Sequence, residues 1–515
     1  MNGADALIET LLANEVTACF ANPGTSEMQF VSALDRQPDM RPVLCLFEGV
    51  ATGAADGFGR IAERPACTLL HLGPGYGNGL ANLHNARRAF TPIVNVIGDH
   101  ATYHRQYDAP LNSDIPTLAS PNSIWLKSAD SPDTVTAVAA EAVAASYGPP
   151  GGPVSLILPA DSAWLETKSE PVRAQKPTRA APAGDKVEGV ARALREASKP
   201  VLLIGGQACL AGGMAAAGRL AAAGYRVLAD TFVARQPRGA GHFQPGRMQY
   251  FGEAALADLE GVDLMVFVGT VTPVAFFAYP GRPSVLVPEG CPTMELASRA
   301  EDSIAAMNAL ADALGAPAQG PVQPLVKPDA APAGALTPQS AGIAIARHLP
   351  EGAIICDDSV TSGGGVAVPC AKAAPHEVLA LTGGAIGQAI PLSIGAAVAA
   401  PERKVLSLNG DGAAMYTVQG LWTIARENLD VTVVVFANHV YRILNIELMR
   451  TGAANQAGPA AAKLLDLGDP NIDWVSMAKA MGVPAVRCET AEDFEKVFAG
   501  AMAQRGPMFI EAAIA

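Results

Sequence analysis

The sequence has little charge, few aromatic residues and no basic block. Of its 515 residues, 17% are charged and 5% are aromatic, whereas 50% are hydrophobic, and the formal net charge is −13. A negative chain without a basic block is a poor partner for nucleic acid or for an anionic membrane surface. The composition is instead typical of compact α/β enzymes, so a small-molecule partner is expected.

Long apolar runs and paired cysteines are also missing. The hydrophobic stretches are interrupted by glycine, proline or charge well short of a membrane span. The amino terminus, MNGADALIETLLANEV, has no basic start and no small-residue cleavage site, so it predicts an amphipathic helix and not a signal. The 8 cysteines show no CxxC spacing, which favours buried free thiols. We therefore expect a cytoplasmic protein.

The chain is too long for a single hydrophobic core, and its length suggests three domains. Helix-like and strand-like segments alternate in each part, which predicts doubly wound parallel sheets. The pattern is lost in residues 168–186 and in the Ala/Pro-rich residues 316–338, which we interpret as linkers. The predicted domains are residues 1–167, 187–315 and 339–515.

The stretch KVLSLNGDGAAMYTVQGLWTIARENLDVTVVVFANHVYRILNIE contains a pattern suited to a metal-bound diphosphate. A strand-like run leads into Gly-Asp-Gly, a helix is predicted over residues 416–427, and a second strand-like run ends just before Asn438. In such a βαβ unit, Asp411 and Asn438 should lie at the carboxyl ends of neighbouring parallel strands. Their oxygens, with the main-chain oxygen of Val440, suit Mg²⁺. Gly-Asp-Gly alone is better explained as a tight turn, but the paired Asn438 reverses that preference.

These motifs resemble those of the thiamine diphosphate (ThDP) enzymes, whose signature pairs Gly-Asp-Gly with a later Asn-Asn. Here the pair is Ala437-Asn438, so only the second asparagine is present, and His439 follows where the family often has glycine. Earlier segments, NPGTSE, FEGVATGAAD, HLGPG and GDHATYH, are similar to those of the acetolactate synthase and benzoylformate decarboxylase group. The resemblance covers the whole chain and implies pyrimidine-binding, central and diphosphate-binding domains.

The resemblance implies three catalytic residues in the first domain. Glu48 would hydrogen-bond the pyrimidine ring of ThDP and favour its imino tautomer; a glutamate that only interacts with a helix amino terminus is the alternative. His71 would exchange protons with the reacting substrate, although a core histidine explains it equally well. Thr25 stands where benzoylformate decarboxylases carry a serine, and it would bind the substrate carboxylate.

The resemblance also implies how the cofactor is held. Ile386 would be the apolar wedge under the bent cofactor, and Gly384 would accept a hydrogen bond from the aminopyrimidine amine. The predicted cofactor-binding residues are Pro23, Gly24, Thr361, Ser362, Gly384, Ile386, Gly410, Gly412 and Ala413. For Thr361 and Ser362, an ordinary turn is an equally good explanation.

The middle of the chain departs from the family pattern. Benzoylformate decarboxylases supply a second catalytic histidine where this chain has FFAYPG, residues 276–281, which argues against benzoylformate as the substrate. Full acetolactate synthases commonly carry a flavin in this domain, but no flavin fingerprint is recognisable, so FAD stays an open alternative without support. His100, His104 and His439 are further polar side chains without an assigned role.

The main hypothesis is a ThDP- and Mg²⁺-dependent enzyme acting on a small 2-oxo acid, with pyruvate as the default by resemblance. Decarboxylation and carboligation both remain open. The resemblance further implies a homodimer or homotetramer with sites between subunits. One alternative is a catalytically silent binding or regulatory subunit, which retention of Glu48, Asp411 and Asn438 disfavours. A nucleotide-dependent oxidoreductase is disfavoured by the missing GxGxxG motif.

Overall fold

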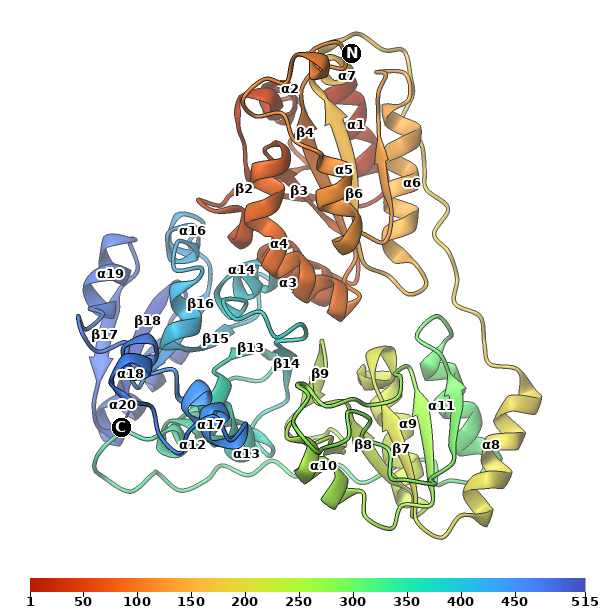
Figure 1. Ribbon diagram of the computed structural model, residues 1–515, viewed down its shortest axis with the longest axis vertical. Helices are drawn as coiled ribbons and strands as arrows, with labels where there is room; N and C mark the ends of the chain where they lie inside the picture. Colours follow the sequence, from red (N-terminus) through yellow and green to blue (C-terminus); the bar gives the residue numbers. More distant parts are fainter. Residues whose placement is uncertain (515) are drawn as a thin grey trace.

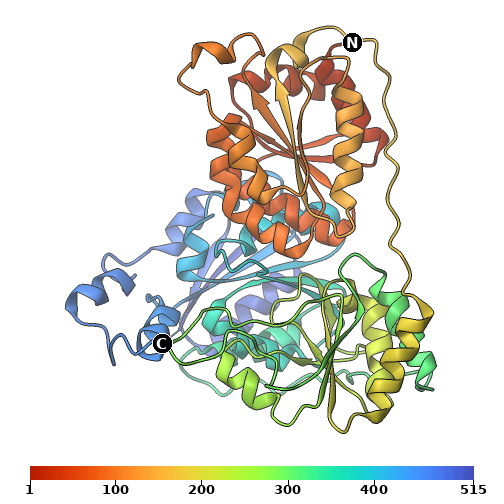
Figure 2. The ribbon, with the colours of Figure 1, turned by 45° about the vertical axis from the view of Figure 1, so that its right-hand side comes forward.

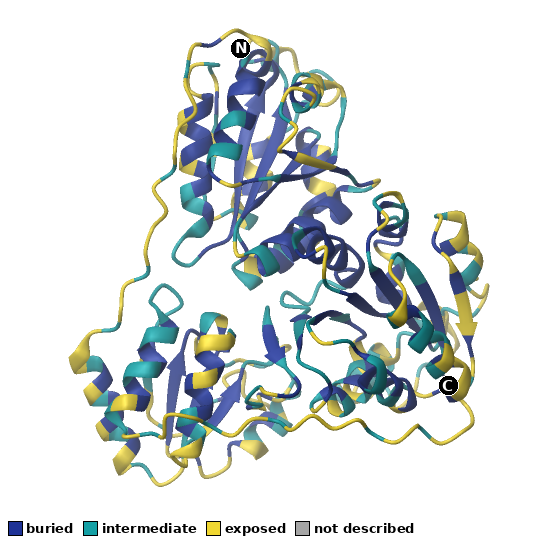
Figure 3. Ribbon diagram, turned by 180° about the vertical axis from the view of Figure 1, so that it is seen from behind, coloured by how far each residue is buried: buried dark blue, intermediate teal, exposed yellow. Residues whose placement is uncertain are grey.

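The computed structural model describes residues 1–514 and contains three α/β domains, which form three lobes (Figure 1). An extended linker, residues 168–183, runs along the outside from the first lobe to the middle one (Figure 2) and is exposed along most of its length (Figure 3). The three sheets confirm the predicted fold class. Within residues 1–514, no helix is both long and apolar enough to cross a membrane.

The first sheet has six parallel strands in the order β2-β1-β3-β4-β6-β5, and helices cover both of its faces. The strands are β1 (Ala18–Asn22), β2 (Arg41–Leu44), β3 (Ala66–Leu70), β4 (Ile93–Asp99), β5 (Leu126–Ser128) and β6 (Pro153–Pro159). The helices are α1 (Gly3–Ala13), α2 (Met28–Leu34), α3 (Glu48–Ala62), α4 (Leu72–Ala89), α5 (Ile115–Ala119), α6 (Val135–Tyr147) and α7 (Ala160–Trp164). Because both faces are covered, strands β3, β4 and β6 are buried throughout.

The middle sheet is smaller, with the parallel order β10-β8-β7-β11-β12. Its strands are β7 (Pro200–Ile204), β8 (Arg226–Ala229), β10 (Gly246–Arg247), β11 (Leu264–Val268) and β12 (Thr293–Ala297). Its helices are α8 (Gly184–Glu196), α9 (Ala211–Ala222), α10 (Gly252–Asp258) and α11 (Ser303–Ala313). Helix α8 begins inside the predicted linker. The domain boundaries themselves stay a prediction.

The third sheet has seven strands in the order β17-β18-β16-β15-β13-β14-β9. They are β9 (Gln236–Arg238), β13 (Ala353–Asp358), β14 (His376–Ala380), β15 (Val405–Gly410), β16 (Val431–Ala437), β17 (Ala485–Cys488) and β18 (Met508–Ala513). Its helices are α12 (Pro338–His348), α13 (Gly363–Cys370), α14 (Ala389–Ala399), α15 (Asp411–Met415), α16 (Gly420–Arg426), α17 (Arg442–Arg450), α18 (Pro459–Leu465), α19 (Trp474–Ala480) and α20 (Ala491–Ala503). Strand β9 pairs antiparallel with β14, so the middle segment of the chain also extends the third sheet.

One predicted element differs from the structure, namely the helix expected in the Gly-Asp-Gly segment. Only part of the helix expected over residues 416–427 forms: α15 ends at Met415, α16 covers Gly420–Arg426, and residues 416–419 form a turn. Within this turn the Thr417 hydroxyl donates to the Gly387 carbonyl at 2.9 Å, so a tertiary contact interrupts the helical pattern.

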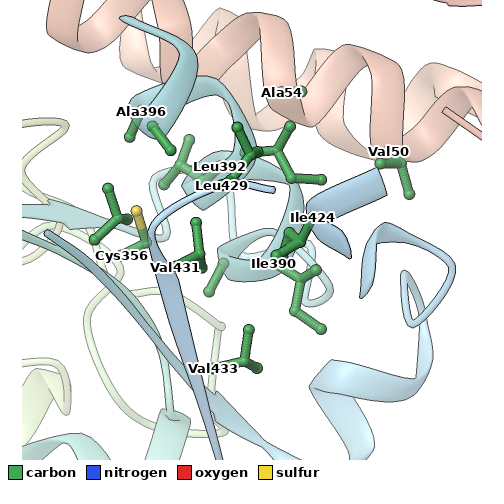
Figure 4. Close-up of a cluster of buried hydrophobic side chains, with 14 of the residues drawn as sticks. Val50, Ala54, Cys356, Ile390, Leu392, Ala396, Ile424, Leu429, Val431 and Val433 are labelled. Carbon is green, nitrogen blue, oxygen red and sulfur yellow. The ribbon is translucent and has the colours of Figure 1, made fainter. Parts of the chain in front are cut away.

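The first and third domains share one hydrophobic core where α3 crosses α14. Figure 4 shows Val50 and Ala54 of α3 close to Ile390 and Leu392. Glycines permit this close approach, since a Cβ on Gly57 would lie 2.0 Å from the Leu392 carbonyl oxygen. A Cβ on Gly395 of α14 would likewise lie 1.8 Å from the carbonyl oxygen of Ala54. The packing of the two domains therefore depends on backbone contact as well as apolar burial.

Candidate active site

Asp411 and Asn438 lie at the carboxyl ends of the adjacent parallel strands β15 and β16. Asp411 Oδ2 accepts hydrogen bonds from the main-chain N–H groups of Asn438 at 3.0 Å and His439 at 2.7 Å. Its Oδ1 accepts from the Gly412 N–H at 2.8 Å. Asn438 Oδ1 accepts from the Val440 N–H at 3.0 Å. The main chain thus orients both side chains.

The oxygens of this pair fit a small hard cation. Burial raises the pKa of the Asp411 carboxyl, and a bound cation would offset that cost. Among the described residues, Asp411 Oδ1 and Asn438 Oδ1 each accept a single main-chain hydrogen bond and so retain a lone pair for a cation. In residues 1–514, no three His, Cys, Asp or Glu side chains form a metal-binding group. A metal here would therefore need the mixed carboxylate, amide and main-chain oxygens that Mg²⁺ accepts.

Three non-glycine residues beside predicted site residues have left-handed backbone conformations. Leu72, which follows His71, has φ +49°, and Val360 also has φ +49°. His439, which follows Asn438, has φ +56°. Such angles cost roughly 1–2 kcal/mol for L-residues and persist where the surrounding structure enforces them, often at functional sites. Glycine adopts a positive φ without strain, which explains why the ThDP enzymes that this sequence resembles often have glycine at the position of His439.

A loop between β14 and α14 contains the predicted pyrimidine-contact residues. Gly384 and Gly387 have φ values of +76° and +94°, which favour glycine. Asp358 Oδ2 at the end of β13 accepts from the N–H groups of Gly387 at 2.7 Å and Gln388 at 2.9 Å. Burial raises the pKa of Asp358 to about 7, and within residues 1–514 its Oδ1 has no hydrogen-bond partner. A buried carboxyl group therefore fixes this loop.

The first domain holds the same loop from the other side. Asn85 of α4 donates to the Ala385 carbonyl at 2.8 Å and accepts from the Ala385 N–H at 3.2 Å. The Gln388 amide donates to Asp56 Oδ2 of α3 at 2.7 Å. The half-buried Ile386 lies between these anchors. Nothing in the sequence pointed to Asn85 or Asp56.

The predicted diphosphate-binding residues gather at the carboxyl ends of the adjacent strands β13 and β15. They are Thr361, Ser362, Gly410, Gly412 and Ala413. A Cβ on Gly410 would meet no atom within 4 Å, so the space beside it is open. A Cβ on Gly412 would lie 2.3 Å from the Tyr441 ring, so glycine is needed there.

Glu48 and His71 lie on either side of Gly75. A Cβ on Gly75 would be 3.3 Å from both Glu48 Oε1 and His71 Cβ. Glu48 is the first residue of α3, is only 6% exposed, and its Oε2 accepts from the Asn78 amide at 3.0 Å. This position is compatible with a buried functional carboxyl group and with the helix-dipole alternative. The structure does bring the two predicted groups together.

Glu27 is a site residue that the sequence reasoning missed, although it lies in the quoted NPGTSE segment. Its Oε2 lies 2.9 Å from His71 Nδ1 and also accepts from the Gly24 N–H at 2.8 Å. The Ser26 hydroxyl donates to Glu27 Oε1 at 2.7 Å and lies 3.2 Å from His71 Nδ1. Glu27 is buried, and a Cβ on Gly98 would lie 1.7 Å from Oε1. The carboxylate therefore has a fitted place beside the histidine.

Other predicted residues have looser surroundings. Thr25 is exposed, and the hydroxyl that approaches His71 belongs to its neighbour Ser26. Pro23 is half-buried in the same segment. His100 and His104 lie beside each other after β4, with ring centroids 5.4 Å apart. The predicted roles of Thr25 and Pro23 stay predictions.

Within residues 1–514, the hydrogen bonds that join the first domain to the cofactor loop do not include Glu48. The first domain reaches the 384–388 loop through Asp56 and Asn85. Asp56 lies two turns after Glu48 on α3, about 12 Å along the helix axis. In the described residues, the Glu48 carboxylate is hydrogen-bonded to Asn78 of its own domain and not to Asp411.

Family models match both of the domains that carry these residues. Residues 1–118 match the thiamine pyrophosphate enzyme N-terminal TPP binding domain, and residues 366–512 match the C-terminal TPP binding domain. The chain belongs to the thiamine pyrophosphate enzyme family, thiamine pyrophosphate being another name for ThDP. The predicted resemblance is thereby confirmed.

Individual relatives align over nearly the whole chain. IlvX of Mycobacterium tuberculosis, which is named for acetolactate synthase large subunits, is 50% identical over 518 residues, covering 100% of this chain and 99% of IlvX. The benzoylformate decarboxylase of Pseudomonas aeruginosa is 28% identical over 533 residues, covering 98% and 97%. The structure of a 4-hydroxybenzoylformate decarboxylase from Rhodococcus jostii superposes with a TM-score of 0.86 at 25% identity, covering 100% and 99%. These relatives place the chain among 2-oxo acid enzymes of the family.

Proposed function

We propose that the chain binds ThDP with Mg²⁺ and acts on a 2-oxo acid by decarboxylation, carboligation or both. One observation carries this proposal: Asp411 and Asn438 converge at adjacent strand ends inside the family's C-terminal TPP binding domain. The class of reaction follows from the cofactor, because ThDP, when bound, would supply an electron sink for the negative charge left on the carbonyl carbon of a 2-oxo acid when a bond to that carbon breaks.

The third domain would hold the charged end of the cofactor. Asp411, Asn438 and the Val440 carbonyl would coordinate Mg²⁺. The backbone at Gly410 and Gly412, with the neighbouring Ala413, would face the diphosphate. The hydroxyl groups of Thr361 and Ser362 would donate to diphosphate oxygens. The open space beside Gly410 supports this assignment.

The loop after β14 and the first domain would hold the reactive end. The Gly384 carbonyl would accept from the aminopyrimidine amine, and Ile386 would support the bend of the cofactor. Pro23 and Gly24 would line the pyrimidine side. Glu48 would hydrogen-bond the pyrimidine ring, a role that its burial supports by excluding water from the contact.

His71 and Thr25 would act on the substrate. The imidazole of His71 would donate or accept a proton at the reacting carbon or its oxygen, because histidine exchanges protons near neutral pH. Glu27 would hold the ring in place through Nδ1. The exposed hydroxyl of Thr25 would bind the substrate carboxylate.

A homodimer or homotetramer would complete the site. Glu48 makes its hydrogen bond within its own domain, and the same-chain contacts to the cofactor loop come from Asp56 and Asn85 instead. We therefore propose that Glu48 serves the ThDP held by Asp411 and Asn438 of a second copy. The proposed domains remain residues 1–167, 187–315 and 339–515.

The test is ThDP-dependent release of carbon dioxide from a panel of 2-oxo acids by wild-type protein and Glu48→Gln. We expect turnover in the wild type and a loss of about 10²-fold or more in the variant, with ThDP still bound. Bound ThDP without turnover on any substrate would favour the catalytically silent alternative. Equal turnover in the two proteins would refute the role of Glu48.

A further inference from the structure

Five aromatic rings of the middle domain form one cluster, which we call the aromatic wall. Its members are Phe232, Tyr250, Phe251, Phe276 and Phe277. Phe276 is central, with ring centroids 4.9 Å from Phe277, 5.2 Å from Tyr250 and 5.8 Å from Phe232. Edge-to-face and tilted pairs at these distances are favourable, so the neighbouring rings hold Phe276 in place.

Phe276 faces the cofactor loop of the third domain. A Cβ built on Gly384 would lie 2.6 Å from Phe276 Cζ, so the ring is in direct contact with this glycine. Yet Phe276 remains 42% exposed and Phe277 53% exposed. Large apolar side chains are seldom exposed when their only role is to pack against other parts of the protein. These two are exposed beside a predicted cofactor contact.

Polar contacts tie the aromatic wall to α17, the helix that follows the proposed metal loop. The Tyr279 hydroxyl donates to Glu447 Oε2 at 2.6 Å. The Arg450 guanidinium lies 3.9 Å from the centroid of the Phe251 ring and forms an ion pair with Glu253. These links join the wall to the same domain that holds Asp411, so its position is set relative to the site.

We propose that the exposed face of Phe276 is the specificity wall of the substrate pocket and selects 2-oxo acids with a large apolar side chain, aryl or branched alkyl. This inference rests on the proposed function. The methyl group of pyruvate covers little of such a surface, whereas an aryl or branched group would bury part of two rings. The Tyr279 hydroxyl next to the wall is bonded to Glu447, and the exposed rings of Phe276 and Phe277 carry no polar group, so proton exchange is left to His71.

The experiment compares kcat/KM for phenylpyruvate, benzoylformate, 4-methyl-2-oxopentanoate and pyruvate in the ThDP- and Mg²⁺-loaded full chain. We expect kcat/KM of the wild type to be about tenfold or more higher for at least one large substrate than for pyruvate, because added apolar contact typically raises kcat/KM by this much. Phe276→Ala should reduce this preference by about tenfold, mainly through KM for the large substrate, and Phe276→Leu by less.

Two controls distinguish failure of the specificity wall from failure of the proposed function. Phe277→Ala removes a neighbouring exposed ring and should change the preference less than Phe276→Ala, because the three atoms nearest a Cβ on Gly384 all belong to Phe276. The ThDP affinity of every variant should match that of the wild type, which shows that the fold and cofactor site are intact. A wild type that prefers pyruvate, or a Phe276→Ala variant with unchanged preference, overturns the specificity wall while leaving the proposed function standing. Absence of ThDP binding in the wild type overturns both.

Discussion

Glu27 Oε2 lies 2.9 Å from Nδ1 of His71 in a pocket that Gly98 leaves open. Glu27 also accepts from the Gly24 N–H and the Ser26 hydroxyl, which are both donors, so the group acts as a carboxylate acceptor. We infer that His71 carries its proton on Nδ1 and presents Nε2 to the substrate. The pair thus fixes both the tautomer and the orientation of the ring.

Glu27→Gln should lower kcat by about 10- to 100-fold with a smaller change in KM, because the substrate site remains while the tautomer of His71 is no longer fixed. The measurements are steady-state kinetics and the ¹⁵N chemical shifts of the His71 ring in the two proteins. Gly98→Ala is the matched steric variant, since its Cβ would displace the carboxylate without removing it. Unchanged ring shifts in Glu27→Gln would contradict this role.

His439 offers a test of backbone strain at the proposed metal loop. Its φ of +56° suits glycine, so His439→Gly should be more stable than His439→Ala by about 1 kcal/mol. Thermal unfolding of the two variants measures the difference. ThDP affinity should be retained in both variants, since the main-chain N–H of residue 439 makes the contact to Asp411. An alanine variant as stable as the glycine variant would show that this conformation is unstrained.

The glycines between α3 and α14 should control how the first and third domains pack. Gly57→Ala places a methyl group 2.0 Å from the Leu392 carbonyl oxygen, so the helices must separate. We expect Tm to fall by about 5 °C or more. Gly77→Ala on α4 is the control, because its Cβ would meet no atom within 4 Å and alanine favours the helix. Similar Tm values for both variants would contradict the close-packing account.

Asp358 should make stability depend on pH. Its folded-state pKa of about 7 exceeds the ordinary aspartate value of 3.8, so the folded protein binds the extra proton. The protonated Asp358 carboxyl therefore makes its full contribution to the free energy of unfolding below about pH 4, and this contribution is lost as the pH rises through 7. Asp358→Asn removes this titration, so its Tm relative to wild type should rise between pH 5 and pH 8. Asp35→Asn at an exposed position is the control, and parallel pH profiles for Asp358→Asn and wild type would contradict the assignment.

Local patterns in the sequence predicted much of the fold and part of the site. Strand-ending polar residues anticipated that Asp411 would meet Asn438, because parallel strands bring their carboxyl ends to one edge. The resemblance to the ThDP enzymes, and not a local pattern, singled out Glu48 and His71, which lie together around Gly75. Each of these two pairs lies in short segments that directly follow strands or begin helices, and such segments can be recognised from the sequence.

Contacts between distant segments could not be predicted in this way. Asn85 holds Ala385, and Phe276 of the middle domain contacts Gly384, although no periodicity connects those positions. Glu27 was visible in a quoted motif, but only the fold shows that it reaches His71. Packing between domains decides the first two contacts, and the pairing of β1 with β3 inside the first domain decides the third.

The central claim is that Asp411 anchors ThDP through Mg²⁺, and calorimetric titration of ThDP into the purified chain tests it most directly. The titration is run with Mg²⁺, with a chelator, and with Asp411→Asn in Mg²⁺. We predict saturable binding for the wild type in Mg²⁺, with affinity reduced about tenfold or more in the other two conditions. Failure of the wild type to bind ThDP, or equal affinity in all three titrations, would contradict the claim.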